Sequence, residues 1–150
     1  MMHPALDNLV KIGQLKEEPT SREEISGHLD HPAQCLKDAA VPGISASGRF
    51  EFAYTAAHAL ALAALRANAV RPDKGPGHRA IVFLSLAHTV GAPEFLWSPL
   101  NRYHTKRNKS EYGQWSRVTD AEAEDLLKLT GDLRHLVLGW LEANRSELLD

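Results

Sequence analysis

One short stretch of the chain, NRYHTKRNKSEYG at residues 101–113, concentrates side chains that bind anions and transfer protons. Helical steps of three and four residues sort it into three stripes, which hold Tyr103 with Arg107, then His104 with Asn108 and Tyr112, then Arg102 with Lys106 and Lys109. Arginine presents a planar fork of donors that fits a phosphate. The stretch therefore predicts either a phosphate-binding site anchored by Arg107 or a solvated helix end whose cations favour the helix dipole.

The stripe that holds Arg107 begins in an apolar run, FLWSPL, which has the composition of a core helix. Leu96 and Leu100 precede Arg107 on it, so Arg107 is expected on the core-facing side. An isolated buried charge is costly, so Arg107 must reach past the core or be paired. Glu111, one helical turn further on, is the expected partner.

The other histidines and the single cysteine have simpler interpretations. His28, Asp30 and His31 have no clear fourth partner for a metal ion, so a helix cap with surface histidines is the better interpretation. His58 is in step with Tyr54 and is expected to be a hydrogen-bonded core histidine; alternatively, both face the Arg107 helix. Cys35 is expected to be a small buried residue.

The segment at 71–79, RPDKGPGHR, contains a faint phosphate-loop pattern. It lacks the Gly-Lys-Ser/Thr ending and the preceding strand, which excludes a nucleoside triphosphate site of that kind. Arg71, Lys74, His78 and Arg79 nevertheless surround an expected helix N-terminus, so the segment is a candidate anion site.

Helical periodicity covers nearly the whole chain and gives the elements that must position these residues. Ser21–Glu24 and Thr119–Glu122 are capping-box patterns. Pro32 is expected to split the helix that Ser21 opens, and Pro99 to kink or restart the one that holds Arg107. No alternating strand pattern is present. The predicted helices are 4–15, 21–31, 31–40, 48–69, 78–90, 94–112 and 119–148, with loops at 41–48 and 70–77.

Four of these helices are substantial and their connections are short, which predicts an all-α, antiparallel up-and-down bundle of four to five helices. Residues 1–20 are expected to form an N-terminal extension with a short helix, and residues 21–150 the bundle. The net charge of −2 argues against a general nucleic-acid binder, so nucleic-acid binding would need a local patch. The apolar runs are too short to span a bilayer, and neither a signal peptide nor a disulfide is expected, which predicts a soluble, cytoplasmic protein.

The sequence Arg107-Asn108-Lys-Ser-Glu-Tyr112, with a helix before it and a capped long helix after it, resembles the signature helix of HEPN domains. These domains are small helical bundles found among prokaryotic toxins and defence systems. The Phe50–Leu65 helix with its Tyr-x-x-Ala core, then Arg71-Pro72 and Gly77-His78-Arg79, resembles a bacterial HEPN-like subgroup. The resemblance covers roughly residues 33–145.

This resemblance implies metal-independent RNA cleavage through the 2′-hydroxyl, with an arginine on the phosphate and a histidine as acid or base, usually across a dimer cleft. Arg107 and Asn108 match the arginine and the polar residue that follows it. The histidine position falls on Tyr112, Gly113 or Gln114, and a free tyrosine, which titrates at about pH 10, is a poor base. His104 lies three residues before Arg107 and is the other candidate.

The expected function is therefore a catalytically degenerate, homodimeric HEPN-like module that binds RNA or a partner protein in a toxin–antitoxin or defence setting. No cofactor, metal or membrane is expected. One alternative is a metal-independent ribonuclease that uses Arg107 with Tyr112 or His104, and the other is a structural homodimer module. The residues expected to contact nucleic acid are Arg102, Lys106, Lys109, Arg71 and Arg79.

Overall fold

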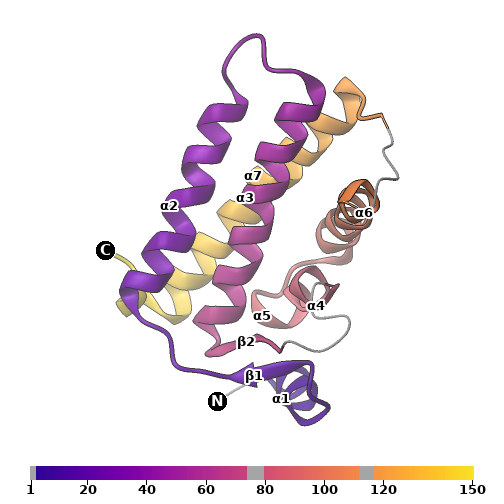
Figure 1. The fold of residues 1–150 in the computed structure, drawn as a ribbon. Coiled ribbons are helices and arrows are strands. Elements are labelled where there is room, and N and C mark those ends of the chain that lie inside the picture. Colours follow the sequence, from indigo (N-terminus) through magenta and orange to yellow (C-terminus); the bar gives the residue numbers. More distant parts are fainter. Residues whose placement is uncertain (1–2, 74–79, 112–116) are drawn as a thin grey trace.

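A computed structural model describes residues 3–73, 80–111 and 117–150, and most of them are helical (Figure 1). The mainly helical class is as predicted. None of the described helices has the length and apolar character needed to cross a bilayer. The elements are α1 (Pro4–Lys11), β1 (Leu15–Glu17), α2 (Arg22–Ala39), α3 (Ala46–Ala67), β2 (Val70–Pro72), α4 (Ala80–Leu84), α5 (Leu86–Thr89), α6 (Glu94–Glu111), α7 (Asp120–Asn144) and a 3-10 turn (Ser146–Leu148).

The four long helices alternate in direction along the chain, as the bundle prediction requires. The start of α2 lies against the end of α3, and α6 runs against both α3 and α7 (Figure 1). Helices α3 and α7 begin at the same end and run parallel, because Arg49 pairs with Asp120 at one end and Arg145 donates to the Ala67 carbonyl at the other. Helix α3 is therefore the central element, with α2 on one side and α7 on another.

The alanine-rich sequence of α3 suits this central place. Small side chains let neighbouring helices approach closely, and apolar burial supplies most of the stabilisation. Seven alanines of α3 are fully buried in the two hydrophobic clusters or beside them: Ala53, Ala56, Ala57, Ala61, Ala63, Ala64 and Ala67. Leu126, Leu133, Val137 and Leu141 of α7 complete the main cluster.

The helix starts follow the capping signals of the sequence. At α7, Thr119 and Glu122 form the predicted capping box in full. At α2, the Ser21 hydroxyl accepts from the Glu24 N–H at 3.1 Å, but the Glu24 carboxylate bonds Arg66 and Thr20 instead. Helix α3 begins at Ala46, inside the predicted loop, because the Ser45 hydroxyl caps it by accepting from the Gly48 N–H at 3.0 Å. Helix α7 ends at Asn144, earlier than predicted.

Pro32 does not split its helix, so that prediction is wrong. Helix α2 is continuous from Arg22 to Ala39 and contains Pro32 in its interior. Ile25, Pro32, Cys35 and Ala39 are its buried residues and lie on one stripe at helical spacing. Packing of this stripe holds both halves on one axis, and it outweighs the hydrogen bond that proline cannot donate.

The predicted helix at 78–90 is interrupted at Ser85, which separates α4 from α5. The Ser85 hydroxyl donates to the Val82 carbonyl at 3.2 Å, so the side chain competes with the main-chain ladder. Residues 78 and 79 lie outside the described part of the chain.

A small antiparallel sheet, which the sequence analysis did not predict, joins β1 to β2 with Lys16 opposite Arg71. Its strands have three residues each, too short for an alternating pattern to be recognised. Leu15 and Val70 are buried and form a second hydrophobic cluster with Leu6, Leu65 and Ile81. The sheet therefore fixes the N-terminal segment to the end of α3.

A buried arginine, Arg66, connects the end of α3 to the segment before α2. Its side chain is 6% exposed, and its donors are directed at protein oxygens. It donates to the Glu24 carboxylate at 2.7 Å, to the carbonyls of Glu18 at 3.1 Å, Pro19 at 2.6 Å and Val70 at 3.1 Å, and it pairs with the Glu18 carboxylate at 3.3 Å. All five guanidinium N–H groups are thus used, which fits a structural role.

Candidate functional site

The candidate site is formed by the second half of α6 against the first half of α3. Leu96, Leu100 and His104 occupy one face at four-residue steps, and all three are buried. The core-facing stripe therefore continues into His104, whereas Arg107 lies beside it and is only partly buried. This is the reverse of the prediction, which places Arg107 on the core-facing stripe and His104 on the next one.

His104 is held between two polar side chains. Its Nδ1 lies 2.9 Å from the Tyr54 hydroxyl of α3, and its Nε2 lies 3.2 Å from Nδ2 of Asn108, one helical turn on. An amide nitrogen donates, so Nε2 accepts and the proton of the neutral ring lies on Nδ1, directed at the Tyr54 oxygen. His104 is 3% exposed, so it holds the Tyr54 and Asn108 side chains in place from the interior of the protein.

Aromatic rings surround His104, which explains why an imidazole is buried on this helix face. The rings of Tyr54 and His104 are nearly parallel, with an interplanar angle of 12° and a centroid separation of 5.9 Å, and the Phe83 ring centroid lies 5.2 Å from that of His104. His58 contacts Tyr54 and Phe83. The alternative in which Tyr54 and His58 face the Arg107 helix is thus confirmed for Tyr54, and Phe83 is a participant that the sequence analysis missed.

The amide of Asn108 is incompletely paired. Its Nδ2 contacts His104, while its Oδ1 is buried and has no hydrogen-bond partner among residues 3–73, 80–111 and 117–150. If the amide were turned so that Oδ1 and Nδ2 exchange places, the nitrogen would then be the buried atom without a partner. A buried polar atom without a partner is uncommon and often marks a place where a ligand binds.

Arg107 lies at the outer edge of this group. Its guanidinium carbon is 5.1 Å from the centroid of the Tyr54 ring, and its Nε is 3.7 Å from a carboxylate oxygen of Glu51. The Arg107 side chain is 27% exposed and that of Glu51 is 53% exposed. Glu51 comes from α3 and was not predicted as a partner; the side chain of Glu111, the expected partner, lies outside the described part. Arg107 is therefore accessible, and the Tyr54 ring supports it.

The predicted nucleic-acid contacts do not form one patch. Arg102 and Lys109 are exposed on α6, but Lys106 bonds the Glu122 carboxylate at 2.8 Å and the Arg117 carbonyl at 3.2 Å. The hydrogen bond from Lys106 holds the pKa of Glu122 below its usual value. Lys106 therefore joins α6 to α7, contrary to its interpretation as part of a solvated face.

Arg71 and Arg79 were the other two predicted contacts. Arg71 lies on β2 and pairs with Glu18 at 3.2 Å. It follows the end of α3, whereas Glu51 lies near the start, and a helix rises ~24 Å over the sixteen residues between Glu51 and Ala67. The structure does not bring Arg71 to the Arg107 site. Arg79 and Tyr112, like Lys74 and His78, lie outside the described residues.

Neither a metal centre nor an activated cysteine is found in the described part of the chain. No group of three His, Cys, Asp or Glu side chains there has metal-binding geometry, and His28, Asp30 and His31 lie within α2. The Cys35 thiol is 3.7 Å from His31, but burial, with a smaller contribution from Asp38, raises its pKa. Cys35 is buried as predicted, and its raised pKa disfavours the thiolate.

The tyrosine nearest to Arg107 on α6 is also unsuited to proton transfer. The Tyr103 hydroxyl donates to Asp125 at 2.6 Å. Burial and this hydrogen bond raise the pKa of Tyr103 to about 12, so it stays protonated near neutral pH. The described arrangement thus presents a supported, accessible guanidinium beside a buried imidazole. Its chemistry suits anion binding better than acid–base catalysis.

Comparison with known proteins adds no relative to this description: no family model, no curated protein and no solved structure matches the chain.

Proposed function

We propose that this chain is a HEPN-like helical module that binds RNA through a backbone phosphate at Arg107 and does not cleave it. The observation that carries the proposal is the position of Arg107, accessible to solvent and supported by the Tyr54 ring at 5.1 Å. Arg107 and Asn108 are the two residues that match the HEPN motif. The direction of the four long helices is compatible with that fold.

The contact between Arg107 and Glu51 indicates that a ligand can replace Glu51 as the partner of Arg107. At 3.7 Å between a half-exposed carboxylate and an accessible guanidinium, the ion pair is weak. An RNA backbone phosphate carries one negative charge, as the Glu51 carboxylate does, and its two free oxygens can accept two parallel hydrogen bonds from the arginine fork. The exposed cations Arg102 and Lys109 on the same helix add attraction for a polyanion.

The state of His104 supports binding without cleavage. Both ring nitrogens are hydrogen-bonded, and the ring is 3% exposed. A general acid or base must come within hydrogen-bond reach of the substrate. In this arrangement the Tyr54 and Asn108 side chains occupy the directions from which His104 would act.

A metal-independent ribonuclease is the second candidate. It is favoured by one specific observation, namely that His104, Asn108 and Arg107 belong to one connected cluster around Tyr54. A small movement of Asn108 would free Nε2 of His104 beside the guanidinium.

One experiment on the native chain distinguishes RNA binding without cleavage from ribonuclease activity. A labelled single-stranded RNA is titrated by fluorescence polarisation at salt concentrations from about 50 to 200 mM, a range over which phosphate contacts weaken steeply. Cleavage of the same RNA is followed in EDTA. We expect binding without cleavage, about tenfold weaker for Arg107→Ala because a charged hydrogen-bonded contact is lost, with a salt slope lower by about 1.

Arg134→Ala is the matched control, because Arg134 is an exposed arginine on α7, away from the cluster. It should bind as the native chain does. Cleavage that Arg107→Ala and His104→Ala both abolish would establish the ribonuclease instead. If neither binding nor cleavage responds to Arg107→Ala, RNA is not the partner of this site, and a partner protein takes its place. The homodimer that the resemblance implies is tested by sedimentation of the native chain.

A further inference from the structure

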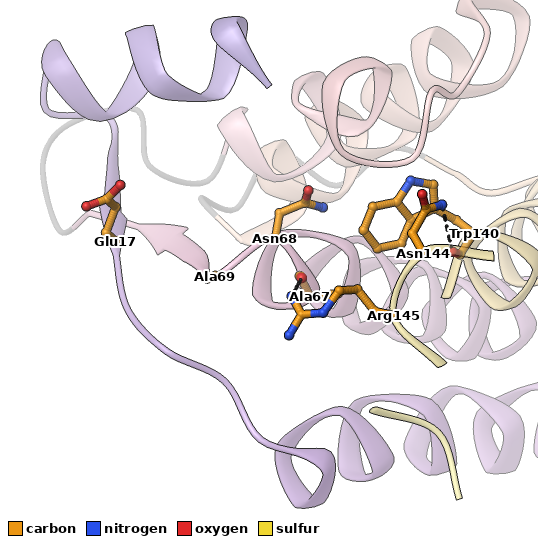
Figure 2. Close-up of a pocket in the computed structure, with 7 residues that line it drawn as sticks. All are labelled: Glu17, Ala67, Asn68, Ala69, Trp140, Asn144 and Arg145. Carbon is orange, nitrogen blue, oxygen red and sulfur yellow. Dashed lines mark hydrogen bonds between the residues drawn. The ribbon is translucent and has the colours of Figure 1, made fainter. Parts of the chain in front are cut away.

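A pocket lies at the other end of α3 from Arg107, where α3 stops beside the last turn of α7. Its volume is about 520 Å³, and it is partly open. Figure 2 shows the indole of Trp140 on one side, with Asn144 next to it and the side chain of Asn68 reaching toward it from the end of α3. The lining also includes Ala69 and Arg145, with Glu17 on β1 at the outer rim. None of these residues belongs to the proposed RNA site.

The two amides of the pocket use their nitrogens within the protein. Nδ2 of Asn68 donates to the Ala64 carbonyl at 2.8 Å and to the Thr89 carbonyl at 3.3 Å. Nδ2 of Asn144 donates to the Trp140 carbonyl at 3.0 Å. Each amide is therefore oriented, and each keeps its Oδ1 as an acceptor to which no described residue donates. Two oriented amides that line the pocket therefore keep one acceptor each.

The guanidinium of Arg145 supplies the complementary donor. Its Nη1 donates to the Ala67 carbonyl at 2.6 Å, and its Nε donates to the Glu147 carboxylate at 2.5 Å. These two bonds hold the group in place, and within the described chain its Nη2 makes no further hydrogen bond. Glu147 balances the charge of Arg145, and Glu17 adds a negative charge at the rim. The pocket therefore favours a neutral ligand over an anion.

Trp140 provides a flat apolar surface. The indole packs against the main hydrophobic cluster and also lines the pocket. Planar rings stack on tryptophan with little loss of conformational entropy, because the indole is already held by the core. A suitable ligand has one flat face together with donors and an acceptor along its edge.

We propose that this pocket binds a nucleobase that carries an exocyclic amino group, stacked on Trp140, with its amino group donating to Asn68 or Asn144 and a ring nitrogen or carbonyl accepting from Arg145. Adenine, cytosine and guanine have this pattern, and uracil lacks the amino group. The base can come from a free nucleoside or from single-stranded RNA. The site is independent of Arg107, so its failure would leave the proposed function untouched.

The test is equilibrium dialysis of the full chain against adenosine, cytidine, uridine and glucose. We expect saturable binding of adenosine and cytidine and about tenfold weaker binding of uridine, which corresponds to one hydrogen bond. Trp140→Leu should abolish adenosine binding. The double variant Asn68→Ala/Asn144→Ala should weaken adenosine binding about tenfold and leave uridine binding nearly unchanged.

Trp97→Phe is the control, since Trp97 is a partly buried tryptophan on α6 that does not line the pocket; it should bind adenosine normally. Circular dichroism establishes that each variant is folded. If Trp140→Leu unfolds, the side-chain amide signals of Asn68 and Asn144 in the native chain answer the question, because they must shift with adenosine. Equal binding of uridine or glucose, or unshifted amide signals, would overturn the proposal.

A second arm separates the two sources of the base. A short oligoadenylate is compared with adenosine, using native chain and Arg107→Ala. Tighter binding of the oligomer that Arg107→Ala leaves unchanged identifies RNA held at this pocket itself. Equal binding of oligomer and nucleoside identifies a free nucleoside as the ligand, and both results support the pocket chemistry.

Discussion

Helix α3 carries a polar cluster near each end, and the two clusters differ in how completely their polar groups are paired. Near the C-terminal end, the five donors of Arg66 all meet oxygens from Glu18, Pro19, Glu24 and Val70. Near the N-terminal end, His104 is fully hydrogen-bonded, but Oδ1 of Asn108 has no partner in the described chain.

The difference separates a structural cluster from a candidate binding site. A buried polar network in which every member is paired adds rigidity and leaves no position for a ligand. A network with an accessible guanidinium and an unpaired amide oxygen at its edge keeps binding capacity. By this criterion Arg66 holds the fold together, and the group around Tyr54 holds Arg107 in place for an anion.

Arg66→Met should have the largest effect on stability. The change leaves the Glu24 carboxylate and three carbonyls without their common donor, so we expect the free energy of unfolding to fall by about 3 kcal/mol. Urea unfolding followed by circular dichroism measures it. Arg66→Lys is the control for charge alone and should still lose stability, because an ammonium cannot reach all five acceptors. A loss below about 1 kcal/mol for Arg66→Met would contradict the structural role.

Tyr54→Phe should have an intermediate effect. The variant keeps the ring beneath Arg107 and removes the hydroxyl that His104 contacts at 2.9 Å, so one buried hydrogen bond is lost at about 1–2 kcal/mol. The same urea titration measures it. Arg107→Ala should cost less than Tyr54→Phe, since its ion pair and ring contact are partly exposed. A larger loss in the free energy of unfolding for Arg107→Ala than for Tyr54→Phe would contradict this ranking.

The pH-dependent contribution of Glu24 to stability should be the smallest of these effects. Burial alone would raise the pKa of Glu24, but the hydrogen bond and charge of Arg66 hold it below its ordinary value of 4.5. A carboxyl whose pKa is lower in the folded state stabilises fully above pH 4.5 and loses this contribution as the pH falls. The contribution is below about 1 kcal/mol, since solvent screens the partly exposed carboxylate.

Urea titrations between pH 6 and about pH 3 measure this contribution, with Glu24→Gln as the variant. The native chain should lose its advantage over Glu24→Gln as the pH falls below 4.5. A constant difference between the two across this range would show that Glu24 does not titrate differently in the folded protein.

Much of the helical framework could be predicted from local patterns. The caps at Ser21 and Thr119 are encoded over a few neighbouring residues, and the structure has them where expected. The breaks were less predictable. Whether Pro32 ends a helix depends on what its stripe packs against. A serine hydroxyl in a helical stretch can bond a main-chain carbonyl or water, so the sequence does not show that Ser85 bonds the Val82 carbonyl.

The candidate site was predicted only in part, because the periodic pattern identified the helix face without its neighbours. The sequence singled out Arg107, Asn108 and His104, and the structure places them together. The periodic pattern placed Arg107 on the core-facing stripe, whereas His104 is the buried residue, because the two positions lie only about 60° apart around the helix. Glu51 and Phe83 come from other helices and carry no local signal.

The sequence by itself determined that the chain forms long helices, where most of them begin, and which stretch holds the cations. Only the tertiary structure decided that Arg66 is a buried anchor, that Lys106 joins α6 to α7, and that Arg107 stays accessible over Tyr54. The physical reason is that caps and helical periods act between residues a few positions apart. The pairing of a buried charge depends on oxygens up to 48 positions away along the chain.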